Sequence, residues 1–328
     1  MVDKILVTGI AGYVGLHVTA ELLRQGDHVV GTVRSAASAE RAQAALGAVA
    51  PREQLTIVEA DLLSDAGWAE AMRGVRFVLH VASPFVLAEP KNPDELIAPA
   101  VEGTCRVLAA AQRAGVERVV MTSSVVAISA GKPSGRYGTG DWSDGTAPIG
   151  AYALSKTLAE QAAWEVVAGG DMELVVINPG FILGPPLGAA GDGQSESMIR
   201  DLVKGKVPMI PDVAMGMVDV RDIARLHVAA LRAPTAAGKR FIAATEEPIS
   251  MAQAAAILRN AGYAKVPTRK APNAAIRLMA LFDREAKGMV PQLGKRVAYD
   301  TQETYDVLQW QPTPLETTLR EMAAALAR

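Results

Sequence analysis

A tyrosine and a lysine stand one helical turn apart in the segment Tyr152-Ala153-Leu154-Ser155-Lys156. Positions i and i+4 of a helix share a face, so the phenol and the ammonium are expected to lie side by side. A neighbouring cation favours phenolate and lowers the pKa of a tyrosine, which starts at about 10. We therefore predict that Tyr152 acts as an acid near neutral pH; a plain surface pair on an amphipathic helix is the alternative.

A serine pair precedes this segment in the chain. Ser123 and Ser124 directly follow the apolar run Arg118–Thr122. A hydroxyl at a strand end, followed by a Tyr/Lys helix, favours the catalytic interpretation of Tyr152 over the surface one.

A glycine-rich turn follows the first apolar run. The segment Thr8-Gly9-Ile10-Ala11-Gly12-Tyr13-Val14-Gly15 has the spacing G-x-x-G-x-x-G. Such a turn lets backbone N–H groups approach a pyrophosphate, and the helix that follows adds the positive end of its dipole. A tight turn for close helix–strand packing is the alternative, but the strand before and the helix after favour dinucleotide binding.

The second apolar run ends in Val33-Arg34-Ser35. A site specific for NAD usually places an acid here, to bind the adenosine ribose hydroxyls. Arg34 stands in its place, and a guanidinium suits a 2′-phosphate by charge and geometry. We predict NADP, with Arg41 assisting; a solvated surface arginine is the alternative. Asp61-Leu62, after the third run, is expected at the adenine or in a simple turn.

Apolar runs alternate with helical segments through the first two thirds of the chain. This alternation predicts an α/β fold with a doubly wound parallel sheet. We expect Pro99 to disturb the fourth helix or to set a boundary within it. The expected strands are Lys4–Thr8, His28–Val33, Leu55–Glu59, Phe77–Val81, Arg118–Thr122, Leu174–Ile177 and Arg240–Ala243, and the expected helices are Tyr13–Gln25, Ala37–Ala48, Ala66–Met72, Pro93–Ala114, Ala151–Ala168, Ser197–Lys204 and Arg221–Arg232.

Composition excludes several classes of protein. The chain has 328 residues, with 33 Lys and Arg against 35 Asp and Glu, which is not the basic balance of a nucleic-acid binder. The single cysteine, Cys105, forms no intramolecular disulfide. No secretory signal and no apolar stretch of about 18 residues is seen, so we expect a cytoplasmic protein with no membrane partner. The four histidines lack metal-ligand spacing, so no metal is expected.

The chain resembles an extended short-chain dehydrogenase/reductase. More narrowly it is similar to the dihydroflavonol 4-reductase-like branch, which includes cinnamoyl-CoA reductases and aldehyde/ketone reductases of fungi and bacteria. The segments that carry the resemblance are Thr8–Gly15, Val33-Arg34-Ser35, His80-Val81-Ala82-Ser83-Pro84-Phe85, Thr122-Ser123-Ser124, Tyr152–Lys156 with Thr157-Leu158-Ala159-Glu160, Asn178-Pro179-Gly180, Asp219-Val220-Arg221-Asp222 and Trp310.

The resemblance implies a Rossmann domain, NADPH and a Ser/Tyr/Lys catalytic set. Tyr152 would protonate the carbonyl oxygen, Lys156 would lower the pKa of Tyr152 and bind the nicotinamide ribose, and Ser124 would polarise the carbonyl. The implied cofactor contacts are Gly9, Gly12, Tyr13, Val14 and Gly15 at the diphosphate, Ala82 and Ser83 at the cofactor edge, and Pro179 near the nicotinamide. The expected apolar substrate pocket comprises Phe85, Val125, Phe181 and Ile182, with Met209, Met215 and Met217.

The pattern loosens after Gly180, where glycines and prolines gather. We expect an NADP-binding Rossmann domain over residues 1–180, to which residues 216–243 return. Residues 181–215 and 244–328 would form a smaller substrate-binding portion, with the ligand in the cleft between the two. A monomer or a homodimer fits this organisation.

One position departs from the branch. Flavonol-type members tend to carry Asn five residues after the catalytic serine, and this chain has Ser129. We therefore predict an NADPH-dependent reductase of a hydrophobic ketone or aldehyde, a small-molecule carbonyl other than a dihydroflavonol. The alternatives are a 3β-hydroxysteroid dehydrogenase-like enzyme or a sugar-nucleotide epimerase with the same triad, and a non-catalytic NADP(H) redox sensor.

Overall fold

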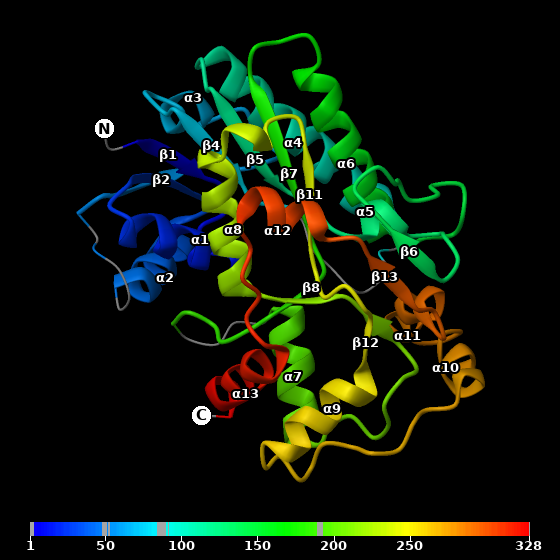
Figure 1. Cartoon of the computed structure of the whole chain (residues 1–328). Helices are drawn as coiled ribbons and strands as arrows, with labels where there is room; N and C mark the ends of the chain where they lie inside the picture. The colour runs from blue at the N-terminus through cyan, green and yellow to red at the C-terminus, as the bar shows by residue number, and fades with distance from the viewer. Residues whose placement is uncertain are drawn as a thin grey trace.

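The computed structural model describes residues 3–47, 51, 53–83, 90, 92–188 and 193–327, without the side chains of residues 284 and 285. Its centre is a sheet of seven parallel strands in the order β11-β7-β5-β4-β1-β2-β3 (Figure 1). Because β1 pairs with β2 on one side and β4 on the other, the winding direction reverses there, as in doubly wound folds. The strands are β1 (Lys4–Val7), β2 (His28–Val33), β3 (Leu55–Glu59), β4 (Phe77–His80), β5 (Arg118–Thr122), β7 (Glu173–Pro179) and β11 (Arg240–Ala243).

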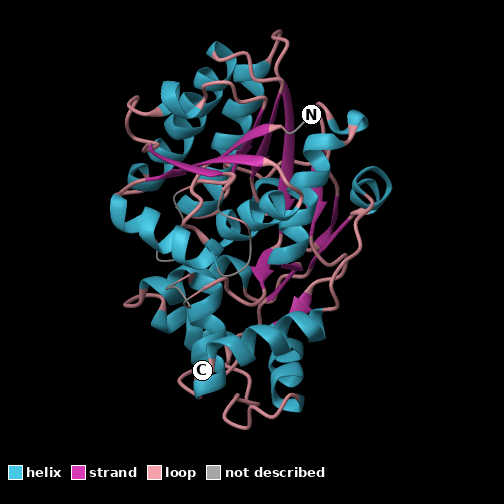
Figure 2. Cartoon of the chain, turned by 90° about the vertical axis from the view of Figure 1, so that its left-hand side faces the viewer, coloured by secondary structure: helices cyan, strands magenta, loops and turns pink. Residues whose placement is uncertain are grey.

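Helices cover both faces of the sheet, as Figure 2 shows. Each face has its own hydrophobic cluster: Ile5 and Val7 belong to one and Leu6, between them, to the other. This burial on both sides explains why the strand sequences are continuously apolar. The first cluster includes α1 (Tyr13–Arg24), α2 (Ala36–Gly47), α8 (Val220–Arg232) and α12 (Gln302–Leu308), and the second includes α3 (Trp68–Ala71), α4 (Asp94–Arg113) and α6 (Ala151–Val167), with α5 (Val126–Ser129) against α6.

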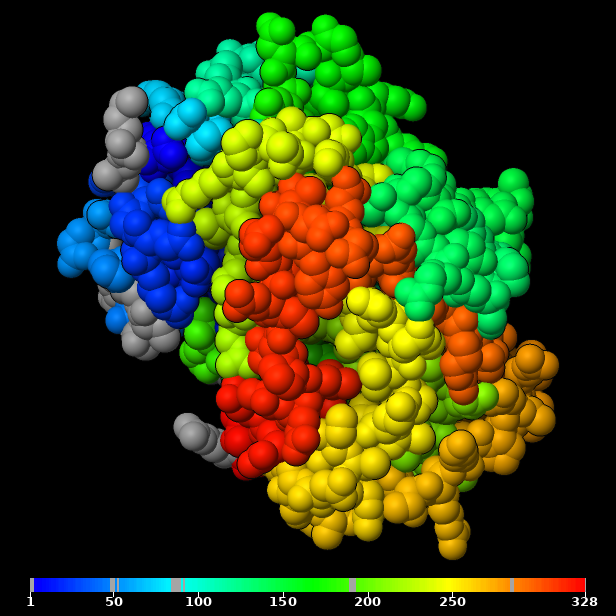
Figure 3. Space-filling view, viewed as in Figure 1, coloured from blue at the N-terminus to red at the C-terminus, as the bar shows by residue number. Residues whose placement is uncertain are grey.

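A smaller portion with its own hydrophobic cluster lies beside the carboxyl ends of the strands. Most of the yellow-to-red residues in the lower half of Figure 3 belong to it. Helix α12 lies higher and contacts β11 of the sheet (Figure 1). Its helices are α7 (Gln194–Lys204), α9 (Met251–Asn260), α10 (Asn273–Met279), α11 (Arg284–Met289) and α13 (Leu315–Leu326). Two strand pairs join it to the rest: β8 (Phe181–Leu183) with β10 (Met217–Asp219), and β6 (Gly135–Tyr137) with β13 (Val297–Tyr299). A third pair, β9 (Ala214–Met215) with β12 (Ile249–Ser250), lies within it.

The predicted fold class is confirmed. The seven strands expected from the sequence are the seven strands of the central sheet, and none of their ends differs by more than two residues. The expectation for Pro99 is wrong, because α4 runs through it without a break. Pro99 stands near the start of the helix and has no N–H to donate to the carbonyl of Glu95. Glu95 is exposed, so water can donate to that carbonyl instead. No helix in the described ranges is long and apolar enough to cross a bilayer.

Arg118 ties the sheet to the carboxyl end of α8. Its Nη1 donates to the carbonyls of Ala230, Leu231 and Ala233 at 2.8–2.9 Å, and its Nε donates to Glu173 Oε2 at 2.6 Å. Those carbonyls are at the end of a helix, where no intrahelical donor remains, and the positive charge also opposes the helix dipole. Arg118 as a whole is 6% exposed, so this contact is largely shielded from water.

We expect Arg118→Met to lower the free energy of unfolding by about 2–4 kcal/mol, because buried carbonyls lose a charged donor. Arg76→Met is the matched control: Arg76 also binds two carboxylates, but its side chain is 48% exposed, and its loss should cost about 0–1 kcal/mol. Urea denaturation followed by circular dichroism measures both. Equal losses in the two variants would contradict the role given to Arg118.

Candidate active site

The predicted cofactor residues lie in loops at one edge of the sheet. In a parallel sheet the carboxyl ends of all strands meet at the same edge, and ligands bind there near the point where the winding reverses. Along the strand order these residues follow one another: Pro179 ends β7, Ser124 follows β5, Ala82 follows β4, the glycine turn follows β1, Arg34 follows β2 and Asp61 follows β3.

The glycine turn brings backbone donors together. Gly9 has φ +70°, and a Cβ added at Gly15 would lie 2.3 Å from the carbonyl oxygen of Gly9, so the turn needs glycine at both positions. α1 begins at Tyr13, and the N–H groups of Tyr13, Val14 and Gly15 have no backbone acceptor in the described part of the chain. Unpaired N–H groups at a helix start form an anion site, which suits a diphosphate.

A buried hydroxyl joins the loops after β1 and β4. Thr8 Oγ1 accepts hydrogen bonds from the N–H groups of Val81 and Ala82 at 3.0 and 2.9 Å, and lies 3.0 Å from His80 Nδ1. Because the oxygen accepts twice, its proton goes to Nδ1, and the imidazole proton is then on Nε2, facing Thr104 at 3.4 Å. Burial lowers the pKa of His80 to about 3, so the ring is neutral and serves to hold the loop.

The residues after β2 and β3 differ in how far they are engaged. Arg34 is exposed, and no partner for its guanidinium lies within hydrogen-bond distance among the described residues. Arg41 is also exposed and donates to Ser38 Oγ at 3.0 Å. Asp61 Oδ1 instead accepts from the N–H of Leu63 at 2.9 Å, which is the local turn that was the alternative for Asp61. Leu62 packs against Gly103 of α4.

The structure brings Ser124 and Tyr152 into contact. Tyr152 is the second residue of α6, and its phenol forms a hydrogen bond with the side chain of Ser124. The neighbouring Ser123 turns away and donates to Glu160 Oε2 at 2.5 Å. This difference supports the choice of Ser124 over Ser123 as the serine of the site.

The direction of the Tyr152 pKa differs from the sequence expectation. Burial raises the pKa of Tyr152 to about 12, and the hydrogen bond with Ser124 is the effect that opposes it. Lys156 is buried one turn further along α6, and burial lowers the pKa of its ammonium to about 8, against the attraction of Glu160. Desolvation therefore outweighs the cation that the i, i+4 spacing suggested. The phenol stays protonated as a proton donor, and Lys156 becomes the group that titrates near neutral pH.

The predicted pocket residues differ in burial. Val125 is 7% exposed and Met217 only 1%, and both pack in hydrophobic clusters, Met217 in that of the smaller portion. The half-buried members are Phe181, Ile182 and Met215, whereas Met209 is exposed and Phe85 lies outside the described residues.

Ser129, which stands where flavonol-type members tend to carry Asn, is hydrogen-bonded within the protein. Its Oγ donates to the carbonyl of Val125 at 3.2 Å and lies 2.9 Å from the hydroxyl of Tyr299 in β13. Both residues are buried, and the pair joins α5 to the strand that pairs with β6. Ser129 thus has partners within the protein, a contact between positions 170 residues apart that the sequence could not reveal.

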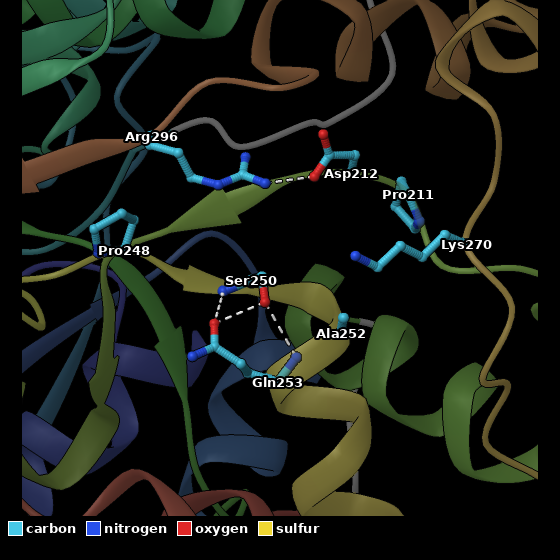
Figure 4. A pocket seen from close by; sticks show the side chains of 8 residues that line it. All are labelled: Pro211, Asp212, Pro248, Ser250, Ala252, Gln253, Lys270 and Arg296. Carbon is cyan, nitrogen blue, oxygen red and sulfur yellow. Dashed lines mark hydrogen bonds and ion pairs between the residues drawn. The ribbon is translucent and has the colours of Figure 1, made fainter.

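A small cavity of about 160 Å³ lies in the smaller portion, between β12, the loop before β9 and the chain before β13 (Figure 4). Arg296 pairs with Asp212 at 2.5 Å on its wall, and Lys270 extends toward the same space. Its lining is charged and polar and contains no residue predicted for the substrate pocket. No group of three or more His, Cys, Asp or Glu side chains that could hold a metal occurs in the ranges described.

The sequence is similar to a known protein family and to several reductases. The sequence profile of the NAD dependent epimerase/dehydratase family matches residues 5–244. The chain is 33% identical over 249 residues to cinnamoyl-CoA reductase CAD2 of Medicago truncatula, covering 73% of this chain and 76% of that protein. It is 32% identical over 298 residues to tetraketide alpha-pyrone reductase 1 of Arabidopsis thaliana, covering 85% and 87%.

A solved structure shares the fold along the whole chain. The yeast methylglyoxal/isovaleraldehyde reductase Gre2, solved in complex with NADPH, superimposes with a TM-score of 0.81 over 98% of each chain, at 24% sequence identity.

We expect Gly15→Ala to abolish dinucleotide binding, because the added methyl group would force the Gly9 carbonyl and the whole turn to move. Gly170→Ala is the matched control, since a Cβ there meets only ordinary contacts at 3.7 Å. Titration of NADPH fluorescence measures affinity, and circular dichroism checks the fold. Wild-type affinity in a folded Gly15→Ala protein would show that the ligand does not use this turn.

Proposed function

The chain belongs to the NAD dependent epimerase/dehydratase family, and from this premise we propose that it reduces a hydrophobic ketone or aldehyde to an alcohol at Ser124, Tyr152 and Lys156. The resemblance to extended short-chain reductases is confirmed, and we propose that the chain uses NADPH, as the yeast reductase solved in complex with it does. The observation that carries the finer proposal is the hydrogen bond between Ser124 and Tyr152, on the helix of Lys156 and at the edge that holds the glycine turn.

The residues at this edge fit the cofactor. The N–H groups at the start of α1 suit the diphosphate, and the guanidinium of Arg34 suits a 2′-phosphate, since neither has a partner among the described residues. We assign Gly9, Gly12 and the first turn of α1 to the diphosphate, Ala82 and Ser83 to the cofactor edge, and Pro179 to the nicotinamide end. When bound, NADPH supplies the hydride.

The chain's own residues manage the proton and the carbonyl. Tyr152 keeps its proton because burial raises its pKa to about 12, and it releases that proton only when an oxyanion forms beside it. Ser124 donates a second hydrogen bond to the same oxygen. Lys156 places a positive charge behind the phenol and stabilises the negative charge left on it.

Two features support an apolar carbonyl substrate. Phe181, Ile182 and Met215 are only half-buried, although each packs against a hydrophobic cluster. Phe181 and Ile182 lie in β8, just after β7, and Met215 lies in β9, close to the end of β7 in the fold. The relatives that match the sequence include a cinnamoyl-CoA reductase and a tetraketide alpha-pyrone reductase. We assign the cofactor to residues 1–180 with 216–243, and the substrate to residues 181–215 and 244–328.

The test is a panel of carbonyl compounds with NADPH, followed at the nicotinamide absorbance. We expect turnover of an aryl ketone, an aliphatic ketoester or an aldehyde. Tyr152→Phe should keep NADPH binding and lose about 10²–10⁴-fold in kcat, because the proton donor is gone. Tyr263→Phe, in the loop after α9, is the control. Turnover confined to a dihydroflavonol or a UDP-sugar would refute the substrate assignment, and an active Tyr152→Phe would refute the acid.

Arg34 should set the coenzyme preference. We expect the wild type to prefer NADPH over NADH and Arg34→Ala to lose roughly 10- to 150-fold of kcat/KM with NADPH alone, since a charge-assisted contact is worth about 1.5–3 kcal/mol. Arg113→Ala, an exposed arginine at the end of α4, is the control. Equal use of both coenzymes by the wild type would overturn this role.

The rate of reduction should fall as the pH rises through about 8. The ammonium of Lys156, whose pKa burial lowers to about 8, is charged below that pH and neutral above it, whereas Tyr152 remains protonated throughout. A profile of kcat at saturating NADPH measures this. A rate that stays constant between about pH 6 and about pH 10 would contradict the part given to Lys156.

A further inference from the structure

A buried carboxylate lies behind Ser124 and Lys156. Glu160 is fully buried in α6, and all its hydrogen bonds go to other elements of the fold. Its Oε1 accepts from Arg240 Nε at 2.5 Å, and its Oε2 accepts from Ser123 Oγ at 2.5 Å and from Asn178 Nδ2 at 2.8 Å. One carboxylate thus binds side chains from three places in the sheet: the end of β5, the end of β7 and the start of β11.

The same cluster reaches the loop that carries Ser124. Asn178 Nδ2 also donates to the backbone carbonyl of Ser124, at 3.2 Å. Arg240 Nη1 donates to the carbonyls of Thr139 and Asp141, and its guanidinium lies 4.0 Å from the ring centre of Trp142. Glu160 therefore connects the serine, through Ser123 and Asn178, with the loop before α6.

Lys156 stands one helical turn before Glu160 on the same face of α6. Among the groups around it, Tyr152 on α6 and His80 at the end of β4 are neutral, and Ser123, Ser124 and Asn178 carry no charge. The cation Arg240, from β11, is already paired with Glu160. Glu160 is the group that favours the ammonium form and so opposes the effect of burial on the pKa of Lys156.

A role in stability alone would not require this arrangement. Burying an ion pair costs about as much as the attraction returns, and apolar residues of similar size often serve stability as well or better. The cluster also leaves two buried atoms, Asn178 Oδ1 and Arg240 Nη2, without a hydrogen-bond partner among the residues described. Buried polar groups without a partner call for an explanation, and a catalytic use of the charge is one of them.

We propose that Glu160 is a positioning residue for the reduction: its carboxylate, held by Arg240, Ser123 and Asn178, fixes the Ser124 loop against α6 and keeps a negative charge behind Lys156. This inference rests on the proposed function of Ser124, Tyr152 and Lys156. It assigns to the buried pair a part in catalysis that the pair plays without touching substrate or cofactor.

The test compares pH profiles of kcat for four variants. Glu160→Gln removes the charge and keeps the shape, Glu160→Asp keeps the charge, and Glu160→Gln with Arg240→Met removes both charges of the pair. Glu165→Gln, an exposed position on the same helix, is the matched control. In Glu160→Gln and in the double variant we expect the alkaline limb to move down by about one pH unit, so that kcat falls about twofold at about pH 7 and about tenfold at about pH 9. KM should change by less than about threefold, and Glu160→Asp should keep the wild-type limb.

The double variant separates the two roles, because it contains no unpaired buried charge. A wild-type profile in the double variant, or in a folded Glu160→Gln protein, would overturn the proposal and leave the pair a structural one. If Glu160→Gln does not fold, the double variant and Glu160→Asp decide by the same criterion; a limb that moves equally in Glu160→Asp and in the double variant would also overturn it.

Failure of the proposed function has a different signature. In that case the wild type shows no NADPH oxidation with any carbonyl of the panel, or Tyr152→Phe is as active as the wild type. The inference about Glu160 fails by itself when the wild type is active, Tyr152→Phe is inactive and the Glu160 variants give one of the overturning profiles described above.

Discussion

The parallel direction of all seven central strands is the constraint on which the rest of the structure depends. It sends every strand's carboxyl end to one edge, and the loops that follow five of the strands carry the glycine turn, Ala82, Arg34, Asp61 and Ser124. Parallel strands must be covered on both faces, which explains the two hydrophobic clusters and the helices that flank the sheet. One of these helices, α6, brings Tyr152 and Lys156 to the edge from the side. The site is therefore a consequence of how the sheet is buried.

The fold was largely accessible to sequence reasoning because its signals are local. The run His28–Val33 has the same bounds in the structure, because its three valines favour a strand and all its residues after His28 are buried. The short strands that link the two portions were not predicted. β8 and β10 have three residues each and pair across 33 intervening residues, so their existence depends on tertiary contacts more than on propensity. Pro99 was expected to disturb its helix and does not, because the cost of a proline in a helix depends on whether water can reach the carbonyl that loses its donor.

The chemistry of the site was only partly accessible. The spacing of Tyr152 and Lys156 indicates which residues share a face, but the sign of a pKa shift depends on burial, which spacing does not report. The residue type of Ser129 or Met217 does not predict its environment, because the partners of both side chains come from distant segments. The sequence shows one member of the Glu160 cluster, an acid one helical turn after Lys156. Arg240 lies 80 residues further along the chain, and only the order of the strands brings it to Glu160.

The position of β11 at the edge of the sheet also affects how the protein is made. β7 ends at Pro179 and its outer neighbour begins only at Arg240, after the chain has passed through α7 and α8. On the ribosome, a nascent chain that has emerged as far as α8 already contains the glycine turn, Ser124, Tyr152 and Lys156. Its sheet, however, still has β7 as an open edge, and the Glu160 carboxylate lacks its ion-pair partner Arg240. The short strand β11 therefore adds the last strand to this edge of the sheet and also supplies the cation behind the site. The nascent protein acquires its edge strand and its buried ion pair in a single late step.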